Sequence, residues 1–255
     1  MNPIVSIIMP CHNGAATIAD AIRSVQNQTF SDWELIVVDD SSSDNSVSVV
    51  QQFAEKDTRV RLLRTEKSSR LPATPRNEGI EAAVGRYIAF LDCDDEWLPT
   101  KLAQQLPLFA TRTVAVVFSY YGKMKTDGTF QNEIIHAPTV LTYKRLLKSN
   151  CIGNLTGIYD TQKIGKIFQK EIHHEDYLMW LEILKRGVIA LNTNTYEAFY
   201  RVQKSSVSGN KIKSMQWHWQ ILRRELKLPF FEAVGNFLFY GIGEIAKRVI
   251  LPIHK

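Results

Sequence analysis

The chain has 255 residues, which is enough for one large domain or for a domain with an appendage. With 45% hydrophobic and 22% charged residues, its composition excludes a largely disordered protein. Three cysteines form an odd, sparse set that argues against a disulfide scaffold and favours a reducing compartment. The net charge is +5, and residues 204–255 carry nine Lys or Arg and three Glu, or +6, which leaves −1 for the rest.

The sequence has few features that indicate targeting, membrane insertion or a binding partner. The first residues lack the basic and apolar regions of a signal peptide, so we expect none. No apolar run reaches the roughly 18–20 residues that span a bilayer. The basic tail is compatible with an anionic membrane surface or with nucleic acid. Because no known recognition motif for nucleic acid accompanies it, we expect no nucleic-acid partner.

The first ninety residues alternate short apolar runs with amphipathic segments. Strands are predicted at residues 4–9, 35–38, 60–63 and 86–90. Helices are predicted at residues 16–26, after Ser43 or Asp44, and from near Pro75 to Gly85. Residues 10–14 are expected to break the first strand. This β-α alternation predicts a parallel sheet with helices on both faces.

The second half is less regular. Helices are predicted at 99–109, 142–148, 173–185, 212–226 and 230–253, and strands at 114–120, 188–191 and 196–200. Asp127-Gly128 predicts a hairpin, so the sheet is expected to become mixed. Residues 152–160 cannot be assigned. The aromatic and basic segment 230–253 is typical of a helix in a membrane interface, and equally of a helix packed on the body.

The acidic cluster Asp92, Asp94 and Asp95 follows the strand at 86–90 directly. Carboxylates packed this closely repel one another, and a divalent Mg²⁺ or Mn²⁺ ion removes that repulsion. Alone, such a cluster is more often a solvated turn before a helix. However, Asp39 and Asp40 follow another strand, and the carboxyl ends of parallel strands share one edge. The convergence of the two pairs predicts a metal and nucleotide-diphosphate site.

Two later segments carry candidate functional residues. Glu175 and Asp176 begin a helix, where negative charge also suits the helix dipole. His173 and His174 are possible metal ligands, but no third ligand stands at a fitting spacing for zinc. Residues 201–209 have the composition of a lid that closes over phosphates, although a plain linker has it too.

These motifs together resemble those of the family 2 glycosyltransferases. The matching stretches are VSIIMPCHN (5–13), QTFSDWELIVVDDSS (28–42), RNEGIEAAVGRYI (76–88), LDCDD (91–95), EDYLMWL (175–181), and Tyr200-Arg201 with Ser206 and Ser208. Their order and spacing cover about the first 210 residues. One departure is Gln203, since the family commonly has a histidine at this position of the lid.

The resemblance implies a GT-A fold, the α/β fold of nucleotide-diphospho-sugar transferases. This fold is a Rossmann-like mixed sheet flanked by helices, here with a C-terminal helical appendage. Residues 1–210 would form the GT-A domain, with a nucleotide-binding half (1–98) and an acceptor-binding half (99–210). Residues 211–255 would form a basic, aromatic helical extension in peripheral contact with the membrane.

The resemblance also implies roles for individual residues. Asp40 would accept a hydrogen bond from the nucleotide base, Asp92 would hold the ribose or sugar, and Asp94 with Asp92 would hold Mn²⁺ or Mg²⁺. The nucleotide and donor would be bound by Pro10, His12, Asn13, Asp39, Asp40, Arg76, Asp92, Cys93, Arg201 and Lys204. Asp176 would be the general base, and the supporting residues would be Asp95, Glu175 and Trp180.

The implied reaction is inverting transfer of a sugar from a nucleotide-diphosphate donor to a hydroxyl of a glycan or lipid-linked acceptor. A UDP-sugar is the expected donor. The resemblance points to bacterial polysaccharide or lipopolysaccharide synthesis at the cytoplasmic membrane face. Donor sugar, acceptor, linkage and oligomeric state stay open. Two alternatives are a phosphohydrolase of the haloacid dehalogenase type and a non-catalytic nucleotide-sugar-binding protein.

Overall fold

The structure is a computed structural model that describes residues 2–65, 71–202 and 211–249. Its strands are β1 (Val5–Cys11), β2 (Trp33–Asp39), β3 (Val60–Arg64), β4 (Tyr87–Phe90), β5 (Glu96–Trp97), β6 (Val114–Met124), β7 (Phe130–Ile135), β8 (Val140–Leu141), β9 (Ile158–Asp160) and β10 (Ile189–Arg201). Its α-helices are α1 (Ile18–Gln26), α2 (Ser46–Ala54), α3 (Ala73–Ala82), α4 (Lys101–Gln105), α5 (Tyr143–Leu146), α6 (Thr161–Ile164), α7 (Glu175–Leu184), α8 (Lys211–Gln220) and α9 (Phe230–Val249). Short 3₁₀ segments (Leu106–Ala110 and Asn154–Thr156) and a π-helical segment (Ile221–Glu225) complete the described elements.

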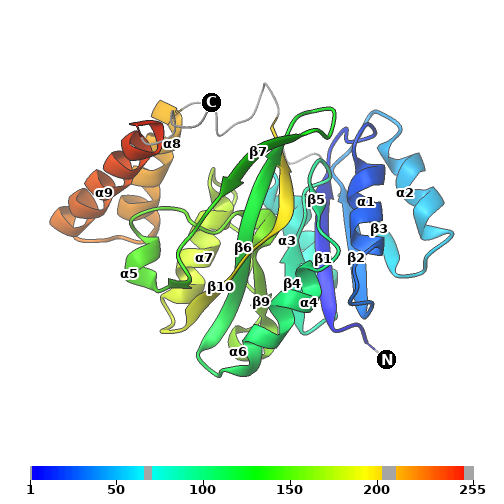
Figure 1. The fold of residues 1–255 in the computed structure, drawn as a ribbon, viewed down its shortest axis with the longest axis horizontal. Helices are drawn as coiled ribbons and strands as arrows, with labels where there is room; N and C mark the ends of the chain where they lie inside the picture. Colours follow the sequence, from blue (N-terminus) through cyan, green and yellow to red (C-terminus); the bar gives the residue numbers. More distant parts are fainter. Residues whose placement is uncertain (1, 66–70, 203–210, 250–255) are drawn as a thin grey trace.

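The centre of the molecule is a mixed sheet with strand order β3-β2-β1-β4-β9-β6-β10-β5, and β7 and β8 pair at its side (Figure 1). The first four strands are parallel, as predicted. From β1 the chain moves outward through β2 to β3, and then returns to place β4 on the other side of β1. Strand order therefore reverses beside β1, and ligands bind at such a reversal, outside the carboxyl ends of the strands.

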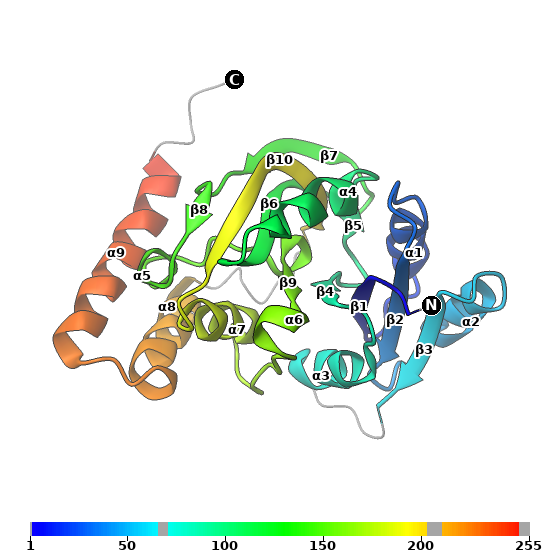
Figure 2. The same ribbon diagram turned by 90° about the horizontal axis from the view of Figure 1, so that it is seen from below.

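Helices cover both faces of this sheet. Figure 2 shows α3, α6 and α7 on one side of the sheet and α1 and α4 on the other. Side chains alternate along a strand, so Ile8 joins the core cluster with α3 and α7. Its neighbours Ile7 and Met9 join the cluster with α1 and α4. The predicted α/β architecture with two covered faces is confirmed.

The prediction that Pro10 breaks the first strand was wrong, because β1 continues to Cys11. Pairing with β2 extends to Cys11, whereas pairing with β4 ends at Ile8 and Phe90. N–H groups two residues apart point to the same side of a strand. The missing N–H of Pro10 therefore faces the side where β4 has ended, and no ladder bond is lost there.

Two other parts of the sheet differ from the predictions. The strands predicted at 188–191 and 196–200 are one strand, β10, which bulges between Asn192 and Tyr196 and holds Asn194 at a φ of 61°. The unassigned segment 152–160 contains β9, which pairs antiparallel with both β4 and β6. A strand of three residues carries too little periodicity to be recognised from sequence.

The C-terminal helices continue the layer that contains α7. Ile221 and Leu222 after α8, and Ala233 of α9, belong to the same core cluster as α7. Helix α8 therefore packs on the body. The boundary predicted at residue 210 adjoins residues 203–210, which lie outside the described part. Across the described residues, none of the helices combines the length and the apolarity that a bilayer crossing needs.

Candidate active site

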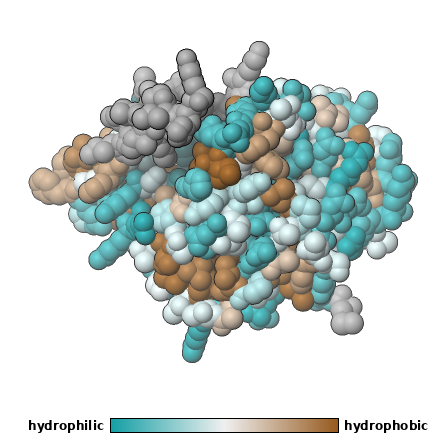
Figure 3. All heavy atoms as spheres, in the orientation of Figure 1, coloured by the Kyte–Doolittle hydropathy of each residue, from teal (hydrophilic) through white to brown (hydrophobic). Residues whose placement is uncertain are grey.

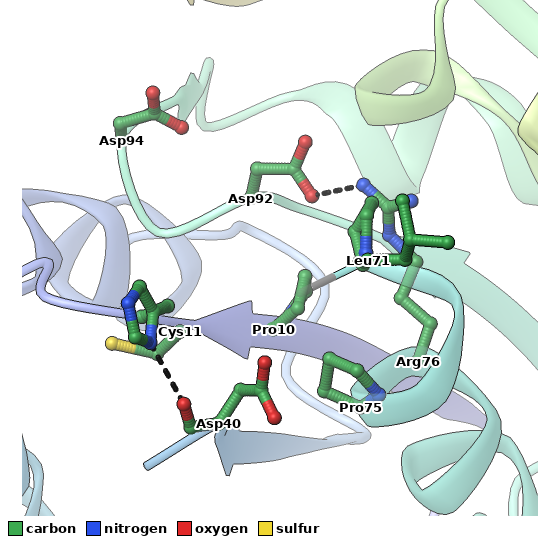
Figure 4. A pocket seen from close by; sticks show the side chains of 10 residues that line it. Pro10, Cys11, Asp40, Leu71, Pro75, Arg76, Asp92 and Asp94 are labelled. Carbon is green, nitrogen blue, oxygen red and sulfur yellow. Dashed lines mark hydrogen bonds and ion pairs between the residues drawn. The ribbon is translucent and has the colours of Figure 1, made fainter. Parts of the chain in front are cut away.

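A cavity of about 470 Å³ opens at the carboxyl ends of β1 and β4, where the strand order reverses. Figure 4 shows Asp92 and Asp94 on one side of it and Asp40 on the other. The lining residues are Pro10, Cys11, His12, Asp40, Leu71, Pro72, Pro75, Arg76, Asp92 and Asp94. The structure thus brings together the two acidic motifs that the sequence predicted to converge.

The ends of β1 and β2 form one wall of the cavity. Thr65, which follows β3, donates a hydrogen bond from its hydroxyl to Asp40 Oδ1 over 2.9 Å. The Asp40 N–H donates to the carbonyl of Cys11, and His12 Nδ1 lies 2.7 Å from the Asp40 carbonyl oxygen. The backbone of Asp40 is therefore fixed at the end of β1, and its carboxylate accepts a hydrogen bond from Thr65 at the end of β3.

The acidic loop 92–96 forms the opposite wall. Asp95 is buried, and one of its carboxylate oxygens accepts the Arg201 N–H over 2.9 Å. Burial, together with the charges of Asp94 and Asp92, raises the pKa of Asp95 well above its usual value. Asp95 therefore supports the loop from the interior of the protein, and it is not one of the residues that line the cavity.

Arg201 is also part of this loop's support. Its side chain is buried, Nε donates to the Asp94 carbonyl oxygen over 2.7 Å, and Nη2 pairs with Glu96 at 2.6 Å. A further bond joins Nη1 to the carbonyl oxygen of Thr126. These contacts fix the backbone that carries Asp94. The role in binding the donor that was predicted for Arg201 stays a prediction, and it would require these bonds to rearrange.

Arg76 connects the acidic loop to helix α7. It lines the cavity, and its guanidinium pairs with Asp92 at 2.7 Å and with Glu175 at 2.6 Å. Arg76 is buried, and the two carboxylates raise its pKa against the effect of burial. The guanidinium therefore remains charged and holds together two acidic groups that lie far apart in the sequence.

Asp176 follows Glu175 at the start of α7. Burial and the negative charge of Glu175 raise the pKa of Asp176 to about 7, although Arg76 lowers it. The charge of Asp92 acts in the same direction as Glu175. A carboxylate with a pKa near neutrality can accept a proton and release it again under cellular conditions, which suits a general base.

Other predicted site residues lie beside the cavity. Asp39 accepts the N–H of Ser42, and the Asn13 side chain accepts the N–H of Ser43, so both shape the turn after β2. Cys93 lies next to Gly14, where an added Cβ would be 2.7 Å from its Sγ. Trp180 is a core residue that packs edge-on against Phe90 and Tyr159. Lys204 falls outside the described residues.

Sequence reasoning missed five residues at this site. Cys11 lines the cavity at the end of β1, Leu71, Pro72 and Pro75 line it at the start of α3, and Thr65 holds Asp40. Thr65 could have been found, because it follows the third parallel strand and so belongs to the same edge of the sheet. The apolar residues carry no chemical signal that would have marked them.

The acidic residues also fit a divalent ion. Within the described parts of the chain, no group of three or more His, Cys, Asp or Glu could hold an ion by itself. However, Mg²⁺ commonly binds one or two carboxylates and takes its other ligands from substrate phosphates and water. Asp92 and Asp94 line one cavity and meet that requirement. Their predicted role as metal ligands therefore stays a prediction with a chemically suitable pair.

Comparisons with known proteins identify the family of this chain. The profile of Glycosyl transferase family 2 matches residues 6–169. The chain is 38% identical to the putative teichuronic acid biosynthesis glycosyltransferase TuaG of Bacillus subtilis, over 97% of this chain and 98% of that protein. It is 37% identical to the UDP-Glc:alpha-D-GlcNAc-diphosphoundecaprenol beta-1,3-glucosyltransferase WfgD of Escherichia coli, over 94% of each chain.

Solved structures share the fold. S. aureus TarS in complex with UDP-GlcNAc superposes with a TM-score of 0.71 at 20% identity, covering 94% of this chain and 71% of that chain. The mannosyltransferase PcManGT of Pyrobaculum calidifontis, in complex with GDP-Man and Mn²⁺, gives 0.70 at 16% identity, covering 100% and 77%. The fold is the GT-A fold that the resemblance implied. The profile match and the two relatives show that this chain belongs to glycosyl transferase family 2 and is a glycosyltransferase.

Proposed function

We propose that the enzyme transfers a sugar, with inversion, from a nucleotide diphosphate to a hydroxyl of a lipid-linked glycan. The main support for the proposal is that Asp40, Asp92 and Asp94 line one cavity. In addition, Arg76 pairs with Asp92 and with Glu175, which begins the helix of Asp176. The relatives support the substrate class, because one of them acts on UDP-Glc and a diphosphoundecaprenol-linked GlcNAc.

The donor would lie in the cavity with its base toward Asp40 and its diphosphate toward Asp92 and Asp94. The carboxylate of Asp40, which the Thr65 hydroxyl holds at the edge of the cavity, would accept the N3–H of a uracil ring. We infer that Asp94, with Asp92, would hold Mn²⁺ or Mg²⁺. Such an ion, when bound, offsets the charge that develops on the leaving diphosphate.

Asp176 would remove the proton from the acceptor hydroxyl as its oxygen attacks the anomeric carbon. A diphosphate is a good leaving group, so no protein acid is required. Attack from the side opposite the leaving group inverts the configuration. Glu175, fixed by its ion pair with Arg76, keeps the start of α7 in place beside the donor.

The acceptor class implies a location. A lipid-linked substrate lies in a membrane, so we propose that the enzyme works peripherally at the cytoplasmic face, within polysaccharide assembly. We keep the division into a GT-A domain (1–210) and a C-terminal extension (211–255) as part of this proposal.

Transfer can be measured with a synthetic GlcNAc-diphosphoryl lipid and a panel of nucleotide sugars, UDP-Glc first, with and without Mn²⁺. We expect glycosylated lipid and free nucleotide diphosphate in equal amounts. Asp176→Asn should retain nucleotide binding and lose transfer by at least about 100-fold, the lower limit for loss of a general base. Full turnover by Asp176→Asn would refute the assigned base. Nucleotide-sugar binding without transfer by the unaltered enzyme would favour the non-catalytic alternative.

A further inference from the structure

Helix α8 packs against α7 and α9 with one face and lines a groove with another. On the inner face, Trp217 stacks on His173 at 4.1 Å, and His218 stacks on Tyr177 of α7 and on Tyr240 of α9. These contacts attach α8 to the helix that carries the candidate base. Its outer face, which includes Trp219, is turned toward a groove shared with α9.

This groove, here called the α8–α9 groove, has a volume of about 840 Å³ and is larger than the donor cavity. Its lining residues are Met215, Gln216, Trp219, Gln220, Arg223, Arg224, Val234 and Phe237. Trp219 and Phe237 meet edge to face at 5.3 Å and form its apolar wall. The lining is thus apolar and aromatic over much of its length, with two arginines in the π-helical segment that follows α8.

Helix α9 also presents large apolar side chains to the solvent. The exposed fractions are 56% for Phe230, 88% for Phe231, 58% for Leu238 and 56% for Phe239. Single exposed apolar residues are ordinary on a protein surface. Four on one helix beside an apolar groove indicate an interaction surface. Figure 3 shows apolar surface at the end of the molecule that α9 forms.

The charged residues that line the groove are positive. Arg223 and Arg224 contribute two cations to the lining, and the described lining contains no carboxylate. One guanidinium N–H of Arg223 donates to the Leu228 carbonyl oxygen, whereas Arg224 is exposed. Residues 204–255 as a whole carry a net +6. An occupant that matches this groove therefore combines long hydrocarbon with negative charge.

We propose that the α8–α9 groove and the exposed apolar residues of α9 bind anionic phospholipid in the face of a bilayer. The acyl chain would lie against Trp219 and Phe237, and the phosphate would lie by Arg224, with Phe231 inserted among neighbouring lipids. The proposal rests on the proposed function for its membrane setting and adds the site and the lipid class. Because α8 is stacked on α7, this attachment also orients the catalytic cavity relative to the membrane.

Flotation of the full chain with vesicles tests the proposal. We expect binding to vesicles of phosphatidylcholine with phosphatidylglycerol and much weaker binding to phosphatidylcholine alone. Arg224→Gln should weaken binding to the anionic vesicles about fivefold, because one cation near such a surface contributes about 1 kcal/mol. The matched control Arg112→Gln removes another exposed cation, which lies just before β6 and outside the groove, and should have no effect.

Two further measurements address the apolar contacts. Phe231→Ser should weaken binding to vesicles, while Phe168→Ser, at another exposed phenylalanine, should not. Lipids brominated on the acyl chain should quench tryptophan fluorescence, and Trp219→Phe should remove much of that quenching. Equal binding to neutral and anionic vesicles, or equal loss in Arg224→Gln and Arg112→Gln, would overturn the proposal. The proposal would also be overturned if light scattering showed a dimer that Phe231→Ser dissociates, and the unaltered enzyme did not bind vesicles.

The outcome can be separated from that of the proposed function. Hydrolysis of the nucleotide sugar in the absence of acceptor reports on the donor cavity and needs no membrane. Hydrolysis without vesicle binding would overturn the lipid site and leave the glycosyltransferase assignment intact. Vesicle binding without hydrolysis or transfer would support the lipid site and count against the proposed substrates.

Discussion

Substitution of Arg76 by methionine tests whether one buried cation holds the site together. The change keeps an unbranched apolar stem and removes the charge that pairs with Asp92 and Glu175. The Glu175 side chain is 11% exposed and the Asp92 side chain 35% exposed. Asp92 can therefore regain water, whereas Glu175 is left as a buried charge without its partner.

Loss of one partner from a buried ion pair destabilises a protein by about 3–5 kcal/mol. We assign this loss to the Glu175 contact and discount the Asp92 contact because of its exposure. In a domain of this size about 1 kcal/mol lowers the melting temperature by about 2–4 °C, so we expect a decrease of about 6–20 °C. Urea unfolding followed by tryptophan fluorescence, together with calorimetry, measures both quantities.

The double variant Arg76→Met/Glu175→Gln provides the internal control. It removes the stranded charge, so it should be more stable than Arg76→Met alone by more than about 1 kcal/mol, a coupling typical of residues in contact. A loss of less than about 1 kcal/mol in Arg76→Met, or no recovery in the double variant, would refute the argument that Arg76 neutralises Glu175.

Three other predictions follow from the site and its support. Asp176 must be ionised to accept a proton, and its pKa is raised to about 7, so the transfer rate should rise with pH between 6 and 8; a flat profile would contradict this role. In Arg76→Met the midpoint should move to higher pH, because Arg76 lowers that pKa. Asp94→Asn should raise the Mn²⁺ concentration needed for half-maximal activity by at least about tenfold. If the variant instead loses the same fraction of activity at every Mn²⁺ concentration, Asp94 is not a metal ligand. Gly157→Ala should lower thermal stability by about 1–3 kcal/mol, as overpacking does, because its Cβ would lie 2.5 Å from the Trp180 ring; calorimetry showing no change would refute this.

Much of the candidate site could be predicted because it depends on local sequence and one topological rule. The apolar runs and helical periodicities of the first ninety residues predicted four strands that proved parallel. Parallel strands place their carboxyl ends at one edge, so Asp40 and Asp94 had to lie close together. No knowledge of side-chain packing was needed for that inference.

The sequence did not predict which charges neutralise one another. Arg76 contacts Glu175, 99 residues away, and Arg201 supports Asp94 from 107 residues away. Such pairs depend on how the antiparallel half of the sheet joins the parallel half. That junction is β9, whose three residues lie between β4 and β6.

The sequence by itself determined which segments form the strands that carry the acidic residues and that these strands are parallel, because hydrophobic periodicity and turn chemistry act over a few neighbouring residues. Only the tertiary structure decided that Arg76 joins the donor cavity to the helix of Asp176, and that α8 stacks on this helix while α9 carries exposed apolar residues. These arrangements arise from contacts between distant segments, whose free energy depends on shape and burial and leaves no local pattern in the chain.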